Sequence, residues 1–416
     1  MTVNTSTTAP LLLKSASNIY IYTGTTDSTN GGPITMWARS GALNASATVG
    51  RIQLQDSVIL NSRGGAITLA GSSSVDGNGR PNGYALSNSA TRGGVGLGLT
   101  AVATGTTAQV LSGGGDISIR GKSTIDGAWG VGAYPGHKID SGTGRIYIDG
   151  WATGTLDGVA LDSTSTVKST ITSAAVANAT TPAIWIVGDC DSTSTATTEQ
   201  RGIWTGTTNT ISATGGGDIL MTGTASAVHS TNPGAIYIQG GDIIASTGYV
   251  KLDGGTTGVV TSFTGSTTNL GALSAGSATG AVTVVGDRIS STGTTTIKTT
   301  GAVVEEPSSA SFAAAFNAST LNVTAGAASL RLGKSGNTSD VTVSAGTVSV
   351  VGNIEIYGAA VTNNASLTTT GTGNITITAS GAYTGSGALN AQGNVVISAL
   401  SFNGTGALTS NGSGGI

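Results

Sequence analysis

Residues that could do chemistry are few in this chain, and they form no recognisable catalytic motif. Cys190 is the sole cysteine among 416 residues and lies between Asp189 and Asp191. A nucleophilic thiolate needs a histidine close in space, and the sequence offers two, His137 and His229. One cysteine also excludes an intrachain disulfide. We therefore interpret Cys190 as an incidental thiol.

The acidic residues are best explained as turn residues. Asp116, Asp218 and Asp242 each follow a glycine and precede an isoleucine, where an Asp side chain hydrogen-bonds nearby backbone. Polysaccharide cleavage would need several carboxylates converging on one face. Calcium would need six to eight oxygen ligands, and no stretch gathers them. "GVGLG" at 94–98 lacks the Lys-Ser/Thr of a phosphate loop. We predict no catalytic residue, no metal or cofactor site, and no enzyme activity.

Four aromatic residues are the candidate ligand contacts. Tyr20, Tyr147, Trp185 and Tyr237 each occupy the middle, outward-pointing position of a short apolar-x-apolar phrase. On aligned strands they could form exposed patches that stack on sugars or contact a partner protein. The alternative is that they pack beneath a neighbouring loop.

Composition narrows the class of protein. Only 9% of residues are charged, the net charge is −3, and 17 Lys and Arg are scattered along the chain, so no basic stripe for nucleic acid exists. No apolar run approaches the roughly 20 residues of a membrane span. Hydrophobic residues make up 38% and are interspersed with 67 glycines, which favours narrow, repeatedly turning β-structure over disorder or helix.

A short repeated phrase, G-x-(Ile/Val)-x-(Ile/Leu/Met/Val), must position these side chains. It is nearly regular near the C-terminus, where its glycines at 352, 373 and 393 are 21 and 20 residues apart (373 − 352 and 393 − 373). Earlier copies contain Ile34, Ile52, Ile67, Ile117, Ile146, Ile219, Ile236, Val250 and Val282, with looser copies at Ile19, Ile184, Leu330 and Val341. Apolar residues alternate with polar or aromatic ones, as in a strand with one buried face.

Short alternating strands without intervening helices predict an all-β parallel β-solenoid with roughly 20–30 residues per coil. We expect residues 1–416 to form a single continuous solenoid. Irregular loop insertions are expected at about 71–114, 187–216 and 303–320, where the phrase is interrupted. The rival architecture, a β-sandwich array, would call for longer strands and a larger aromatic core than 4% aromatic residues provide.

Phrases such as "GGDISI", "GGDILM" and "GNITITASGAYTGSGALNAQGNVVISA" resemble bacterial exoproteins of the filamentous-haemagglutinin type and related autotransporter adhesins. The resemblance implies a right-handed parallel β-helix, secreted to the bacterial cell surface by an outer-membrane partner. It covers most of the chain through its pattern and carries no catalytic residue over. It also implies that the sequence is a fragment of a longer exoprotein.

The functional expectation is a structural and adhesive segment of a secreted surface fibre that mediates host or biofilm adhesion. Its expected partners are glycans or surface proteins of host or neighbouring cells. The alternative is a β-helical protein that binds or degrades polysaccharide, like a tailspike or lyase. A third hypothesis is end-to-end self-association into an extracellular filament or surface layer, since open coil ends carry unpaired strands.

Overall fold

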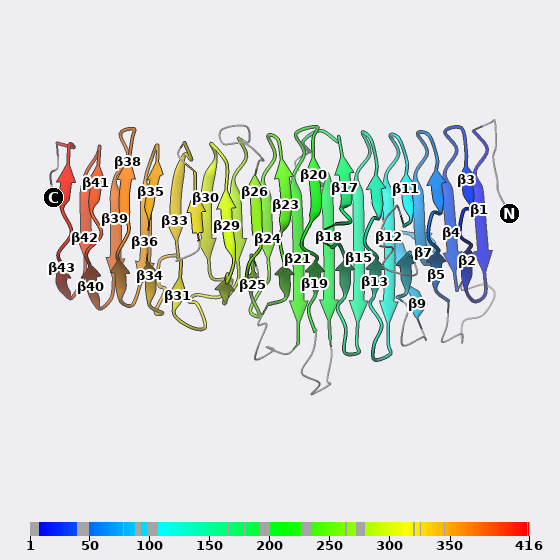
Figure 1. Ribbon diagram of the computed structural model, residues 1–416, viewed down its shortest axis with the longest axis horizontal. Coiled ribbons are helices and arrows are strands. Elements are labelled where there is room, and N and C mark those ends of the chain that lie inside the picture. Colours follow the sequence, from blue (N-terminus) through cyan, green and yellow to red (C-terminus); the bar gives the residue numbers. More distant parts are fainter. Residues whose placement is uncertain are drawn as a thin grey trace. The chain divides into compact units, whose positions relative to one another are not determined.

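The structure is a computed structural model that describes residues 8–39, 50–77, 79–87, 93–98, 107–164, 166–178, 180–191, 200–226, 234–262, 264–271, 279–318, 321–324, 326–344, 346–413 and 415. Every regular element in these ranges is a β-strand. The chain divides into two compact units, Met1–Asp242 and Ile243–Ile416. Both are stacks of parallel strands, and the fold is a parallel β-helix, as the sequence predicts (Figure 1).

Unit 1 has three sheets, each taking one strand per coil. Sheet 1 contains β1 (Leu11–Ser15), β4 (Ile34–Ala38), β7 (Ile67–Val75), β12 (Ile117–Ser123), β15 (Ile146–Ala152), β18 (Ile184–Cys190) and β21 (Ile219–Ala225), with β8 (Pro81–Gly83) and β9 (Ala85–Ser87) at its side. Sheet 2 contains β2 (Ile19–Ile21), β5 (Ile52–Leu54), β10 (Val95–Leu97), β13 (Val131–Ala133), β16 (Val159–Leu161), β19 (Ile203–Thr205) and β22 (Ile236–Ile238). Sheet 3 contains β3 (Thr26–Ser28), β6 (Ile59–Asn61), β11 (Gln109–Leu111), β14 (Lys138–Asp140), β17 (Ser169–Ser173) and β20 (Asn209–Ala213). β23 (Gly241–Ala245) spans the boundary between the units.

Unit 2 changes its cross-section along the stack while one sheet runs throughout. That sheet contains β24 (Val250–Asp253), β27 (Val282–Val285), β30 (Ala302–Glu306), β33 (Ser329–Leu332), β36 (Ile354–Gly358), β39 (Ile375–Ala379) and β42 (Val395–Ser398). Its first coils are completed by the pair β25 (Val259–Val260) and β28 (Ile289–Ser290), and by β26 (Thr267–Gly271), β29 (Thr294–Ile297) and β32 (Leu321–Val323). Its later coils are completed by β31 (Phe316–Asn317), β34 (Val341–Val343), β37 (Val361–Asn363), β40 (Ala382–Gly385) and β43 (Ser401–Gly404), and by β35 (Thr347–Val350), β38 (Ser366–Thr369), β41 (Leu389–Ala391) and β44 (Leu408–Ser410).

The core consists of files of aliphatic side chains, one residue per coil. The first position of sheet 1 pairs in register from Ile34 through Ile67, Ile117, Ile146 and Ile184 to Ile219, and all six are fully or almost fully buried. In unit 2 the matching file runs through Val250, Val282, Val303, Leu330, Ile354, Ile375 and Val395. Burial of these branched side chains against their neighbours along the file stabilises the stack, because no coil can bury its own apolar face alone.

Most coils of unit 1 are longer than the predicted 20–30 residues, although the coil from Ile117 to Ile146 advances by 29 (146 − 117). The register of sheet 1 advances by 33 residues from Ile34 to Ile67 (67 − 34) and by 50 from Ile67 to Ile117 (117 − 67). The later coils of unit 2 fit the prediction, with an advance of 21 residues from Ile354 to Ile375 (375 − 354). The prediction failed in unit 1 because copies of the phrase occur on two faces. Those at Ile19, Ile52 and Ile236 lie in sheet 2, whereas most others lie in sheet 1.

Glycines on sheet 1 and in the segment that faces it let sheets 1 and 2 approach closely. Gly121, Gly150 and Gly188 occupy one register position of sheet 1, and a Cβ at Gly150 or Gly188 would lie 2.0 Å from the carbonyl oxygen of Gly158 or Gly202 in the facing segment. Because that distance is far below van der Waals contact, only glycine fits.

Side-chain carbonyls at the strand entrances join one coil to the next. Asn353 Oδ1 accepts a hydrogen bond from the backbone N–H of Asn374 at 2.9 Å, and Asn374 Oδ1 accepts one from the N–H of Asn394 at 2.7 Å. Asp116 does the same for the N–H of Arg145 at 2.8 Å. At Asp116, Asn353 and Asn374 the polar residue before the isoleucine therefore bonds the backbone of the following coil.

The predicted loop insertions were drawn too wide. Range 71–114 contains the end of β7 and all of β8 to β11, and range 187–216 contains most of β18 and all of β19 and β20. Range 303–320 contains β31 and most of β30. The alternation is masked there by glycine and polar residues at inward positions. Part of each range, including Arg92, lies outside the described residues.

Candidate functional site

A hairpin leaves the stack of unit 1 and lies over the outer face of sheet 1. Residues Gly71 to Val75 of β7 turn away from the coil and pair antiparallel with β8. β9 then fills the vacated place, pairing with Gly121–Ser123 of β12. At the tip, the Asp76 N–H donates to the Arg80 carbonyl at 2.7 Å, and Asp76 Oδ1 accepts from the Arg80 N–H at 2.9 Å. The turn therefore fixes the position from which the Arg80 side chain projects.

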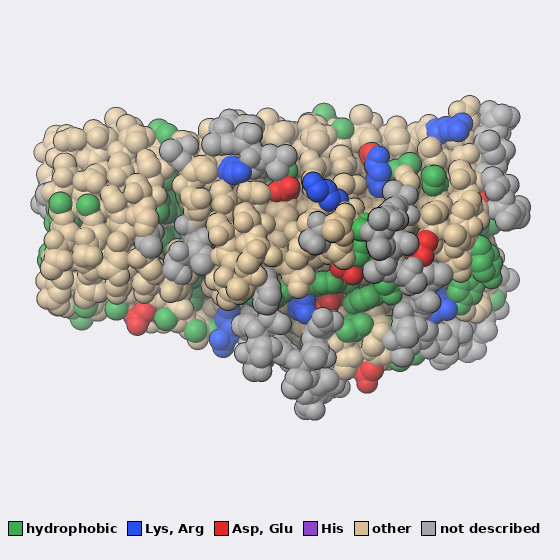
Figure 2. Space-filling model, in the orientation of Figure 1, with side chains coloured by type: hydrophobic (Ala, Val, Ile, Leu, Met, Phe, Trp, Pro, Cys, Tyr) green, Lys and Arg blue, Asp and Glu red, His purple; other side chains and the backbone are tan. Residues whose placement is uncertain are grey.

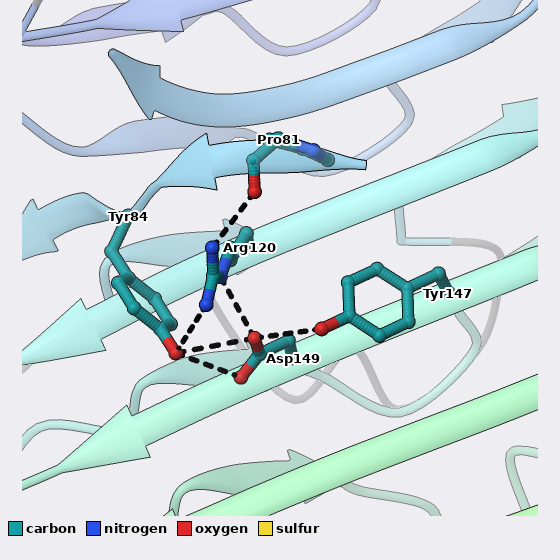
Figure 3. Close-up of polar contacts among 5 residues, drawn as sticks. All are labelled: Pro81, Tyr84, Arg120, Tyr147 and Asp149. Atoms are coloured by element: carbon teal, nitrogen blue, oxygen red, sulfur yellow. Dashed lines mark hydrogen bonds and ion pairs between the residues drawn. The ribbon is translucent and has the colours of Figure 1, made fainter. Parts of the chain in front are cut away.

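A buried ion pair anchors the hairpin to sheet 1 (Figure 3). Arg120 Nε donates to Asp149 Oδ2 at 2.8 Å, and Arg120 Nη1 donates to the carbonyl of Pro81 at 2.8 Å. Two tyrosine hydroxyls also donate to Asp149, Tyr147 at 2.9 Å and Tyr84 at 3.1 Å. Since Arg120 and Asp149 pair in register on β12 and β15, the strands of sheet 1 by themselves place the two side chains next to each other.

The electrostatics of this network follow from burial. Burial raises the pKa of the Asp149 carboxyl, although the Arg120 guanidinium opposes that shift. Burial and the Asp149 charge raise the pKa of Tyr84 to about 12, and the same two causes raise the pKa of Tyr147. Burial alone would lower the pKa of Arg120, but Asp149 and Tyr84 together raise it. Both tyrosines therefore stay protonated as hydrogen-bond donors.

A change of side-chain size along one outward row of sheet 1 creates a pocket beside the hairpin. The row pairs Thr68, Ser118, Tyr147 and Trp185 on four successive strands. Two small residues beside two large ones leave a hollow of about 250 Å³, which we call the Arg80 pocket. Its lining is completed by Ala66, Gly79, Arg80, Asp116, Ile117, Arg145, Ile146, Thr181 and Pro182.

Arg80 is held above the aromatic wall of this pocket. Its guanidinium carbon lies 4.3 Å from the centroid of the Trp185 ring and 5.0 Å from that of Tyr147, within the range of a cation–π interaction. The two rings meet edge to face at 5.5 Å. In the described part of the chain, no carboxylate forms an ion pair with this guanidinium. The arrangement presents a pre-positioned cation to a solvent-accessible cavity, and such a fork can bind an anion.

Of the four aromatic residues singled out from the sequence, the structure brings Tyr147 and Trp185 together and separates the other two. Tyr20 and Tyr237 belong to the first and last coils of sheet 2 in unit 1. Tyr20 is 36% exposed and its hydroxyl accepts from Arg51, whereas Tyr237 is 2% exposed beneath the Arg201 guanidinium. The four do not form one patch.

Arg120 and Asp149 were missed by the sequence reasoning. They lie in "ISIRGKS" and "IYIDGWA", and alignment of these two segments on Gly121 and Gly150 places Arg120 opposite Asp149. That alignment is the signal that could have found them.

The thiol and the imidazole are buried in local structure. Cys190 is 2% exposed, and its Sγ lies 3.5 Å from the Leu156 carbonyl oxygen. Burial lowers the pKa of His137 to about 4, and its Nδ1 lies 3.0 Å from the Tyr134 carbonyl oxygen. His229 lies outside the described residues.

Comparison with known proteins adds no assignment: no family model, no curated protein and no solved structure matches this chain. Within the described ranges, no group of three or more His, Cys, Asp and Glu side chains could hold a metal ion. The same ranges contain no helix with the length and apolar character that crossing a membrane requires.

Proposed function

We propose that this chain is a structural and adhesive segment of a secreted bacterial surface fibre, with the parallel stack as its stiff scaffold and the outer face of sheet 1 as its contact surface. The observation that carries the proposal is the unbroken register of the aliphatic files within each unit, from Ile34 to Ile219 and from Val250 to Val395. Inter-coil backbone hydrogen bonds and packed files give stiffness without disulfides.

The C-terminal part of unit 2 and the outside of unit 1 differ in a way that supports different roles. Glu355 is the single charged residue in the sequence from 341 to 416, and the face of this part seen in Figure 2 consists mostly of uncharged polar side chains and backbone, with a few hydrophobic side chains between them. Such a surface suits a spacer. Unit 1 instead carries the anchored hairpin and the Arg80 pocket on the outside of its stack. Binding residues on a rigid scaffold commonly lie on such excursions.

The test is bead adhesion. Beads coupled to the folded 416-residue chain should adhere to cultured epithelial cells or to a bacterial biofilm more strongly than beads coupled to the same chain unfolded in urea. Equal adherence of the two bead types on every surface tried would refute the adhesive role.

A further inference from the structure

We infer that the Arg80 pocket binds a single hexuronic acid unit of an acidic polysaccharide. The inference uses the pocket's own chemistry, and the choice of a glycan among carboxylate-bearing ligands rests on the proposed adhesive function.

The guanidinium of Arg80 is matched to a carboxylate. The other arginine of the lining, Arg145, already donates to the carbonyls of Thr181 and Val176. An arginine guanidinium is planar and pairs with a carboxylate through two parallel hydrogen bonds, which a lysine cannot reproduce. Arg80 is already oriented by Trp185 and Tyr147 on one side and by the Asp76 turn on the other. Little side-chain entropy is therefore lost when an anion binds.

The remaining polar groups are matched to hydroxyls. Ser118 is 8% exposed, and within the described residues its hydroxyl and that of Thr68 have no hydrogen-bond partner, although both line the cavity. Asp116, which also lines the cavity, can accept a hydrogen bond from a ligand hydroxyl. A ligand with one carboxylate and several hydroxyls satisfies all these groups, and a uronic acid has that composition.

The size of the pocket limits the ligand to one ring. At about 250 Å³ the cavity falls below the range of about 300–1,000 Å³ that drug-sized ligands occupy. The aromatic wall of Tyr147 and Trp185 supplies apolar surface for the C–H face of a pyranose.

The role of the buried network is to keep the pocket formed. Arg120 bonds both Asp149 and the Pro81 carbonyl, one residue after Arg80, so the ion pair fixes the hairpin next to the turn that carries the cation. Arg120 and Asp149 are positioning residues, and neither lines the cavity.

The experiment is isothermal titration of the full chain with trigalacturonate and, as the neutral counterpart, with trigalactose. We expect saturable binding of trigalacturonate alone. Arg80→Ala and Arg80→Lys should each weaken it at least about tenfold, because a charge-assisted bidentate pair is lost in both. Ser118→Ala should weaken it to a smaller extent, and Arg63→Ala, which removes an exposed arginine outside the pocket, should leave it unchanged.

Equal binding of the two sugars, no binding of either, or full affinity in Arg80→Ala would overturn the inference. Circular dichroism of each variant shows whether the fold persists. Bead adhesion and uronate titration of the native chain together separate this inference from the proposed function. Adhesion of the beads without any binding of uronate would refute the pocket inference alone. Binding of uronate without any adhesion would refute the adhesive role alone.

Discussion

Replacement of Glu305 by glutamine should stabilise unit 2 at neutral and alkaline pH. Glu305 lies on the inward face of β30, in register with Val284 and Leu332, and is 3% exposed. Within the described residues, no hydrogen bond or ion pair reaches its carboxyl group. The small cavity beside it, about 10 Å³, is lined by Thr261, Ile289, Ser290, Ser291, Thr295, Phe316, Asn317 and Ala318, and none of these is charged.

The magnitude follows from the pKa. Burial raises the pKa of Glu305 from 4.5 to about 7. The native state therefore binds a proton that the unfolded state has already released between these two values. The free energy of unfolding falls as pH rises from about 4.5 through about 7 and is constant above that. A difference of roughly 2.5 pKa units corresponds to about 3 kcal/mol lost by pH 8.

The assay is urea unfolding followed by circular dichroism at pH 5, 6, 7 and 8. All five tryptophans precede residue 243, so tryptophan fluorescence would not report on unit 2. Glu305→Gln should match the native chain at pH 5 and exceed its stability by up to about 3 kcal/mol at pH 8. The control is Glu355→Gln, whose side chain points outward from β36. A Glu305→Gln chain that gains nothing at pH 8, or gains equally at pH 5, would refute the reasoning.

Three further substitutions test the packing of unit 1, each through its unfolding midpoint. Gly188→Ala should destabilise unit 1 by about 1–3 kcal/mol, because the new Cβ would lie 2.0 Å from a facing carbonyl oxygen. The control, Gly77→Ala, adds its Cβ in open space and should leave the stability unchanged. Equal unfolding midpoints in the two variants would contradict the close approach. Ile186→Ala should lower the free energy of unfolding by about 2–5 kcal/mol, because it opens a cavity in a buried file. Val176 is 68% exposed, so Val176→Ala should lower it little. A similar loss of stability in both variants would argue against the file. Asp149→Asn should cost up to about 3 kcal/mol, because it removes the charge partner of the half-buried Arg120 guanidinium. Limited proteolysis should then cut the β7–β8 hairpin faster, and unchanged cleavage would show that the ion pair does not anchor it.

The stack was predictable from sequence because its signal is local. Strict alternation in phrases such as that of Ile354 and Ile356 reports a strand with one buried face, and glycines beside it report a turn. The face on which each copy lies was not predictable. Ile52 and Ile67 sit in similar phrases, yet they occupy different sheets, because the lengths of the intervening segments decide which side a copy reaches.

Only part of the candidate site could be predicted from the sequence in this way. Tyr147 and Trp185 were identified because the outward position of an alternating strand is a local property. Arg80 lies in the irregular range 71–114 and was not singled out. Its place over the two rings depends on a hairpin that is anchored by Arg120, 40 residues away in sequence (120 − 80). Contacts of that kind depend on register between coils, which the sequence does not state.

The Asn353–Asn374–Asn394 steps have a consequence for how such a chain can change in length. Each step offers one acceptor to the coil that follows and receives one donor from it, so every step is chemically equivalent to its neighbours. Excision of residues 374–393 would bring Asn394 to the place of Asn374 with the same bond available and the aliphatic file shortened by a single side chain. Gain or loss of whole coils therefore leaves the local environments intact. Duplication of about 20 residues should disturb the structure less here than insertion of a single residue.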